Sequence, residues 1–167
     1  MFDLNKLSEK QLAYLLREAG KALKKKMHLK GNPMVTSDYG RWLFTSKNNY
    51  ELNTAPNASF DVGYPNNYVI KTLLTKNIIG NHVFNWSTRT DSIYYIFIIL
   101  NEQYDLLKAI KMFFHAHEHS LGEVQVSLRI TINTDGQITS PQVGFDQGLN
   151  NQYFHIDSIE DITDSLR

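Results

Sequence analysis

One uninterrupted apolar run, IYYIFIIL at residues 93–100, limits the possible folds of this chain more than any other feature. The run is too short to cross a membrane as a helix, because a membrane-spanning helix needs about 20 apolar residues. Its β-branched and aromatic residues favour a strand, and the lack of polar alternation predicts that both faces of that strand are buried. We therefore expect the central strand of a sheet, with further structure packed on each side.

The composition supports a single domain with a substantial core. The chain has 167 residues, of which 42% are hydrophobic, and this is ample for one domain. It has no cysteine, so disulfides, thiolate metal sites and cysteine nucleophiles are excluded. The first residues, MFDLNKLSEK, lack the basic start and the apolar run of roughly 7–15 residues that mark a secretion signal. We expect a cytoplasmic protein without membrane association.

Residues 8–28 carry the clearest helical pattern. Ser8 and Gln11 have the spacing of a capping box, and Gly31 and Pro33 follow as stop signals. With a helical repeat, the apolar residues of this segment gather on one face. They are Leu12, Leu15, Leu16, Ala19, Ala22, Leu23 and Met27. An amphipathic N-terminal helix is predicted.

A β-hairpin is predicted in the C-terminal third. The segment VQVSLRITI at residues 124–132 alternates apolar and polar side chains, which predicts a strand with one face in water. A turn over residues 133–136, Asn-Thr-Asp-Gly, leads into the return strand ITSPQVGF at residues 138–145. Pro141 cannot donate to a ladder, so the return strand should be an edge strand or contain a bulge. HVFNW at residues 82–86 predicts a further strand.

The remaining elements have weaker local signals. We expect strands and loops over residues 34–64, a short helix through YVIKTLLTKN at 68–77, and a long helix over 101–117. A last helix over 157–166 would place Asp157, Asp161 and Asp164 on one side. The expected fold class is α+β: a single domain with a mixed or antiparallel sheet and a C-terminal β-hairpin, packed by the amphipathic N-terminal helix and a second long helix.

Three histidines stand close together in HAHEH, at residues 115–119. If the helix over 101–117 continues through them, His117 faces the core, whereas His115 and His119 share the polar face. Two histidines four residues apart on a helix can bind one zinc ion, which would suggest a metal-dependent hydrolase. The same face carries Lys108 and Lys111, whose charge opposes a bound cation.

Our preferred interpretation of the cluster is structural: histidines at a helix C-terminus, where the helix dipole favours them. A second interpretation is an anion-facing surface that continues from Lys108 and Lys111 to His115 and His119. The metal site would regain support if that helix ended near Phe114, because an extended chain would then place all three histidines on one face.

Charge is segregated along a chain whose net charge is zero. Residues 1–47 carry ten Lys or Arg and four Asp or Glu, whereas residues 120–167 carry two and seven. The polar face of the N-terminal helix is basic, through Arg17, Lys21, Lys24 and His28. This face can follow a phosphate backbone, so a nucleic-acid or phosphate-binding function is one alternative. Pairing with the acidic C-terminal helix, within the chain or in a homodimer, is another.

Protein binding is the function that we expect from the sequence. No nucleophile elbow, phosphate loop or dinucleotide fingerprint occurs, and no catalytic residue is assigned. Aromatic residues that can anchor an interface are frequent after the first helix. The expected partner-binding residues are Arg17, Lys21, Lys24, His28, Tyr39, Trp42 and Tyr50. We expect a non-enzymatic protein that acts by surface complementarity, such as an inhibitor, an immunity-type protein or a phage-encoded accessory protein, without a cofactor.

Overall fold

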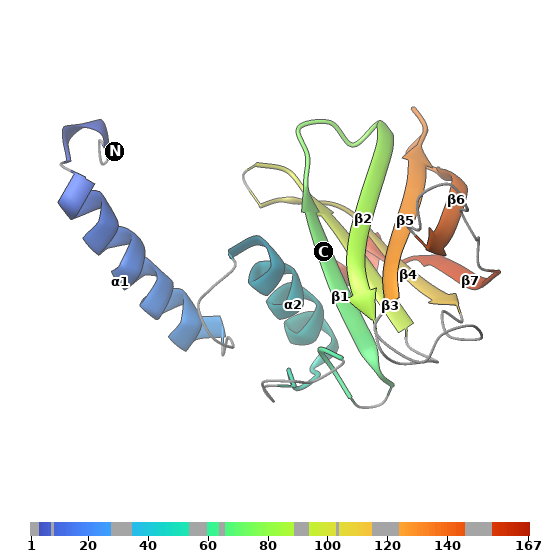
Figure 1. The fold of residues 1–167 in the computed structure, drawn as a ribbon, viewed down its shortest axis with the longest axis horizontal. Helices are drawn as coiled ribbons and strands as arrows, with labels where there is room; N and C mark the ends of the chain where they lie inside the picture. The colour runs from blue at the N-terminus through green and yellow to red at the C-terminus, as the bar shows by residue number, and fades with distance from the viewer. Residues whose placement is uncertain are drawn as a thin grey trace.

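The computed structural model describes residues 4–7, 9–27, 35–53, 60–63, 66–88, 94–102, 104–114, 124–145 and 155–167. These residues form an α+β fold in which two long helices come before the first strand and a short helix follows the last strand (Figure 1). The helices are a 3-10 turn (Leu4–Lys6), α1 (Glu9–Met27), α2 (Val35–Asn48) and α3 (Thr163–Leu166). The strands are β1 (Tyr68–Leu74), β2 (Gly80–Thr88), β3 (Tyr94–Leu100), β4 (Leu106–Phe114), β5 (Val124–Ile132), β6 (Ile138–Phe145) and β7 (Ile156–Asp161). The predicted fold class is confirmed.

The strands form two sheets. Sheet A has the order β1-β3-β4-β7 and is mixed, because β1 runs parallel to β3 while the other neighbours are antiparallel. Sheet B has the order β2-β5-β6 and is antiparallel throughout. β3 lies inside sheet A and is buried from Tyr95 to Leu100, so the predicted central strand is confirmed.

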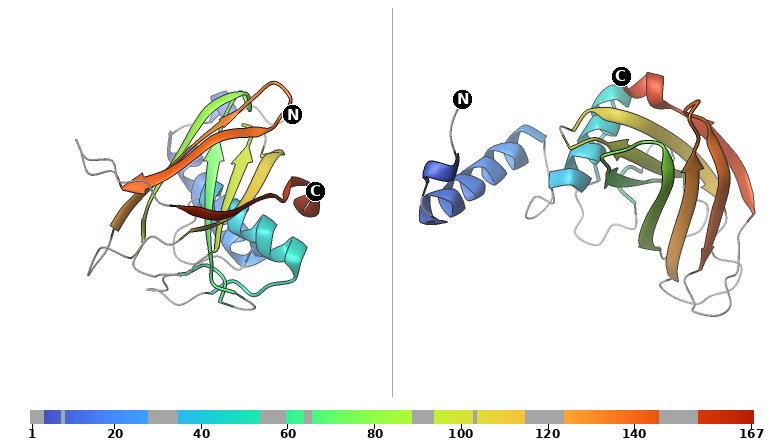
Figure 2. Two further views of the ribbon diagram at one scale, coloured as in Figure 1. Left: turned by 90° about the vertical axis from the view of Figure 1, so that its right-hand side faces the viewer. Right: turned by 90° about the horizontal axis from the view of Figure 1, so that it is seen from above.

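Alternate residues of β3 pack against two different layers of the structure. Phe97 faces sheet B, where its ring centroid lies 4.9 Å from that of Phe84 and 5.4 Å from that of Trp86. Ile98, on the opposite face, joins a separate apolar cluster with Leu43 and Phe44 of α2. Sheet A is therefore sandwiched between α2 and sheet B, which explains why β3 has no polar alternation. Figure 2 shows sheet B and α2 at different sides of the molecule.

The predicted hairpin is confirmed in both its turn and its edge position. The side-chain oxygen of Asn133 accepts the backbone N–H groups of Asp135 and Gln137, at 3.1 and 2.8 Å. β6 is the edge strand of sheet B, as Pro141 requires. The register also shifts between Arg129 and Thr131 of β5, opposite the proline, so an irregularity accompanies the edge.

The long helix predicted over residues 101–117 is wrong, because β4 occupies most of this segment. Asn101 forms a turn instead of a helix cap: its backbone N–H donates to the Asp105 carbonyl at 3.0 Å, and its side-chain oxygen accepts the Asp105 N–H at 2.8 Å. This turn directs β4 back along β3. Ile110, Met112 and Phe114 then point into the core between the sheets.

Three further assignments differ from the sequence prediction. Residues 35–48 form α2 instead of strands, residues 68–74 form strand β1 instead of a helix, and residues 156–161 form strand β7 instead of the first part of a helix. α2 and β1 depend on each other. Gly40 of α2 sits so close to β1 that an added Cβ would lie 1.9 Å from the hydroxyl oxygen of Thr72. Contacts between distant segments override local propensity here.

The amphipathic N-terminal helix is confirmed as α1, and its principal neighbour is α2. Met27 at its end is buried. Farther back, Leu15 is 38% exposed, and Ala19 and Ala22 are also exposed. Figure 1 shows α1 extending away from the sheets, and these three residues of its apolar face are open to solvent.

Candidate functional site

A cavity of about 400 Å³ lies where the end of α1 meets the end of α2. It is lined by Met27, Trp42, Thr45, Ser46, Asn49, Tyr50, Glu51 and Leu52. Trp42 and Tyr50, two of the residues predicted to bind a partner, therefore lie at the same site. Tyr39 has a different place: its ring packs against Trp42 at 5.5 Å and Tyr104 at 5.3 Å, which supports Trp42 from the side of the β3–β4 turn.

The C-terminal end of α2 positions Tyr50. Asn49 has a φ of 55°, in the left-handed region, which ends the helix and turns the chain. The backbone N–H of Tyr50 then donates to the Thr45 carbonyl at 2.9 Å. The Tyr50 ring stacks on Tyr68 of β1, with centroids 5.7 Å apart. Burial, together with the neighbouring Tyr68, raises the pKa of Tyr50 above its ordinary value.

Four lysines are exposed on the last two turns of α1: Lys21, Lys24, Lys25 and Lys26. Lys21 makes an ion pair with Glu18 at 2.8 Å, on the same helix. The side chain of Arg17 and the whole of His28 lie outside the described residues, so those two predicted site residues are not placed. The lysines lie beside the open apolar face of α1 and close to the end of α1, where Met27 lines the cavity. We call this combination the α1–α2 surface: Leu15, Ala19, Ala22, the four lysines, Trp42 and Tyr50.

A buried ionic cluster anchors α2 beneath this surface. Arg41 of α2 has its Nε 2.7 Å from Asp61 and its Nη1 3.1 Å from Asp38. The other oxygen of Asp61 accepts the N–H of Ile70 in β1 at 2.7 Å, so this aspartate joins α2 to sheet A. Burial lowers the pKa of Lys71, although the nearby Asp61 carboxylate acts in the opposite direction. The cluster joins the helix to sheet A, because Asp61 contacts both Arg41 of α2 and the backbone of β1.

His115 and His119, the predicted metal ligands, lie outside the described residues, and the zinc hypothesis stays a prediction. Among the residues that the structure describes, no group of three or more His, Cys, Asp or Glu side chains could hold a metal ion. The strand before the histidines ends at Phe114.

The anion-facing surface expected from Lys108 and Lys111 is wrong. These residues are three apart in a strand, so they lie on opposite faces of β4. Each pairs with an acid of β7: Lys108 donates to Asp161, and Lys111 lies 3.6 Å from Glu160. The acidic face of a C-terminal helix is also wrong, because Asp157 and Asp161 belong to β7.

Comparison with known proteins gives no relative for this chain. No protein-family model matches the sequence, and no curated protein matches it either. Of the helices that the structure describes, none is both long enough and apolar enough to cross a membrane.

The sequence did not reveal the participation of six further residues in the cavity, namely Met27, Thr45, Ser46, Asn49, Glu51 and Leu52. The signal for the turn was present in the Asn48-Asn49 pair, because asparagine tolerates the left-handed conformation that ends a helix. We interpreted this region as strands, however, so no helix end was expected there.

Proposed function

We propose that this protein binds another protein through the α1–α2 surface and acts by surface complementarity. The observation that carries this proposal is the open apolar face of α1, on which Leu15 remains 38% exposed in a chain with an extensive core. An amphipathic helix normally buries such a face. A face that stays open beside a cavity lined by Trp42 and Tyr50 offers anchoring positions of the kind that dominate protein interfaces.

The charges around this face indicate the chemistry of the partner. Lys21, Lys24, Lys25 and Lys26 are exposed along the same helix. A partner that carries carboxylates around an apolar centre would match both features, and opposite charge would accelerate its association. An acidic, amphipathic protein surface is therefore the partner that we propose. An inhibitor or an immunity-type protein acting in the cytoplasm would use such a surface.

A nucleic acid is a less suitable partner for this surface. A phosphate backbone would use the lysines but would leave Leu15, Ala19 and Ala22 in water. Glu18 already neutralises part of the charge of Lys21, and Glu51 adds a negative charge at the cavity. The chain as a whole also has no net charge. These features favour a partner that contributes apolar contacts as well as anions.

Site-specific photo-crosslinking tests the proposal in cells that produce the protein. A photoreactive phenylalanine analogue replaces Leu15 in one variant and Ile79 in a matched control, since Ile79 is similarly exposed (45%) but follows β1. We expect a discrete protein adduct from position 15 only. The double substitution Lys21→Glu and Lys24→Glu should abolish it, whereas Lys76→Glu, which changes a lysine with an 83% exposed side chain elsewhere, should not.

Other outcomes of this experiment contradict the proposal. An adduct that disappears on nuclease treatment would indicate a nucleic acid, and an adduct with a second copy of the chain would indicate a homodimer. Equal adducts from positions 15 and 79, or no adduct from either, would remove the basis for a partner on α1. Sedimentation over a range of protein concentrations would identify self-association independently.

A further inference from the structure

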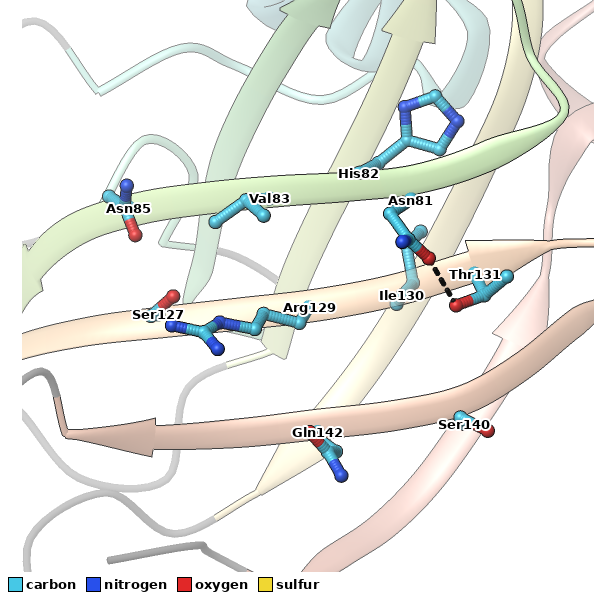
Figure 3. Close-up of a pocket in the computed structure, with 10 residues that line it drawn as sticks. All are labelled: Asn81, His82, Val83, Asn85, Ser127, Arg129, Ile130, Thr131, Ser140 and Gln142. Atoms are coloured by element: carbon cyan, nitrogen blue, oxygen red, sulfur yellow. Dashed lines mark hydrogen bonds between the residues drawn. The ribbon is translucent and has the colours of Figure 1, made fainter. Parts of the chain in front are cut away.

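The outer face of sheet B carries a second cavity, of about 450 Å³ (Figure 3). Strands β5 and β6 of this sheet lie on the side of the molecule away from α1 (Figure 1). Because side chains alternate along a strand, most of its walls come from alternate residues of β2 and β5, together with two residues of β6; His82 and Ile130 border it as well. The polar side chains are Asn81, Asn85, Ser127, Arg129, Thr131, Ser140 and Gln142. Figure 3 shows these groups on the face of the sheet, with His82 pointing elsewhere.

The cavity contains one positive charge without a balancing negative charge. Arg129 is exposed and pairs across the strands with Val83 on one side and Gln142 on the other. No lining residue is acidic, and Arg129 makes no ion pair with any residue that the structure describes. A guanidinium that makes no ion pair keeps its planar set of N–H donors available, and these donors match two oxygens of a carboxylate or phosphate.

Ser127 supplies a second feature that points to a ligand. It lies two residues before Arg129 on the same face of β5, and only 8% of it is exposed. Its hydroxyl oxygen is buried and has no hydrogen-bond partner. Buried hydroxyls are nearly always hydrogen-bonded, because leaving one unpaired is costly. Figure 3 shows the Arg129 guanidinium extending along β5 toward Ser127, so a group bound there can contact both.

The backbone is irregular at the same place. The β5–β6 register shifts between Arg129 and Thr131, and Ser140, which lines the cavity, has a φ of 48°. Left-handed conformations are uncommon for serine. Bulges of this kind re-aim side chains and recur beside binding sites. Here the irregularity interrupts the regular pairing of β5 with β6 at the edge of the cavity.

The remaining walls limit the class of ligand. His82 is the one lining residue with an aromatic ring, and it points away from the cavity (Figure 3), so no aromatic side chain offers a stacking surface for nucleic-acid bases there. It also lacks the carboxylates that a hard metal ion requires. Amide and hydroxyl groups surround the cation, which suits a ligand rich in hydroxyls. The volume is in the range of small-molecule sites, roughly 300–1,000 Å³.

We propose that this cavity binds a small hydroxylated oxyanion, whose phosphate or carboxylate is held by Arg129 and Ser127 while its hydroxyls contact the surrounding amides. The inference concerns a different surface from the proposed protein-binding site and does not depend on it.

Titrations followed by amide chemical shifts in NMR spectra of the full chain test the proposal. The probes are glucose 6-phosphate, gluconate and glucose, which share a hydroxylated body and differ in the oxyanion, together with inorganic phosphate. We expect saturable shifts at residues 81, 85, 127, 129 and 142 with at least one of the two hydroxylated oxyanions. Glucose should bind much more weakly. A response to glucose 6-phosphate alone would identify a phosphate ligand, and a response to gluconate alone a carboxylate ligand.

Variants separate recognition from folding. Arg129→Gln should weaken binding at least about tenfold, because a charge-assisted bond is lost. Arg167→Gln, which removes an exposed arginine outside the cavity, should leave binding unchanged. Ser127→Ala should also weaken binding, yet it should not lower the urea midpoint, since it deletes an unpaired buried hydroxyl. The proposal is overturned if no hydroxylated oxyanion gives saturable shifts at these residues, if glucose binds as tightly, or if Arg129→Gln binds like the unmodified protein.

Discussion

Sheet A and sheet B differ in how many of their faces are covered, and their central strands show the difference. β3 of sheet A is buried from Tyr95 to Leu100, because α2 covers one face and sheet B the other. β5 of sheet B is buried on its inner face at Val126, Leu128 and Ile130, whereas Gln125 and Arg129 on its outer face are exposed and Ser127 between them is buried. An open face must be polar to stay in water, and its polar groups are then available to bind a ligand.

The covered faces should determine the stability of the fold, and the open face should contribute little. Phe97→Ala removes a fully buried ring between the sheets, so we expect a loss of about 3–5 kcal/mol in the free energy of unfolding. Val83→Ala, on the open face of sheet B, should change it by less than about 0.5 kcal/mol. Urea unfolding of the two variants measures both values.

A comparable loss from the two substitutions would contradict this distinction. It would mean that the outer face of sheet B is covered in solution, for example by another copy of the chain. Repeating the Val83→Ala measurement over a range of protein concentrations would reveal such a cover, because the stability of an associated state depends on concentration.

The close contact of α2 with sheet A should tolerate no added volume. Gly40→Ala would place its methyl group 1.9 Å from the Thr72 hydroxyl oxygen, so we expect a loss of about 1–3 kcal/mol despite the higher helix propensity of alanine. Thr72→Ala alone should cost less, since the Thr72 hydroxyl is buried without a partner. In the double variant the two losses should not add, and thermal or urea unfolding of all four proteins gives the coupling.

If Gly40→Ala were neutral, α2 would approach β1 less closely than the structure indicates. Losses that simply add in the double variant would point instead to separate effects on the helix and on the strand.

The edge strand β7 of sheet A should respond to pH through the ion pair of Asp161 with Lys108. Burial alone would raise the pKa of Asp161, but hydrogen bonds from Lys108 and Thr163 outweigh it and lower that pKa below the ordinary value of 3.8. The resulting stabilisation is complete above the unfolded pKa and is lost as pH falls through the lower folded value. Asp161→Asn should therefore cost about 1 kcal/mol at pH 7, with a smaller difference from the unmodified protein below pH 4.

Glu160→Gln is the matched control, because the Glu160–Lys111 pair is longer (3.6 Å) and more exposed. Its loss should be under about 0.5 kcal/mol. Urea unfolding from pH 3 to pH 7 compares the two variants. A constant difference between Asp161→Asn and the unmodified protein over this range would show that the carboxylate charge of Asp161 does not stabilise β7.

Local sequence patterns were sufficient to predict some of the helices and strands. β3, the β5–β6 hairpin and α1 were predicted because each has a signal within one segment: a continuous apolar run, strict alternation followed by an Asn-Thr-Asp-Gly turn, and an amphipathic face with caps. Of the predicted site residues, Trp42 and Tyr50 meet at one cavity, and Lys21 and Lys24 are exposed nearby. The cavity itself could not be predicted, because it depends on where α2 ends.

The sequence by itself determined that a strand at residues 93–100 must be covered on both faces and that residues 124–145 form a hairpin with one wet face. The tertiary structure decided the rest. Residues 106–114 have apolar side chains that fit either a helix or a strand, and the turn at Asn101 brings them beside β3, which supplies the hydrogen bonds of a strand. The polar cavity around Arg129 likewise exists only because three strands place their outward side chains together, and no single segment records that neighbourhood.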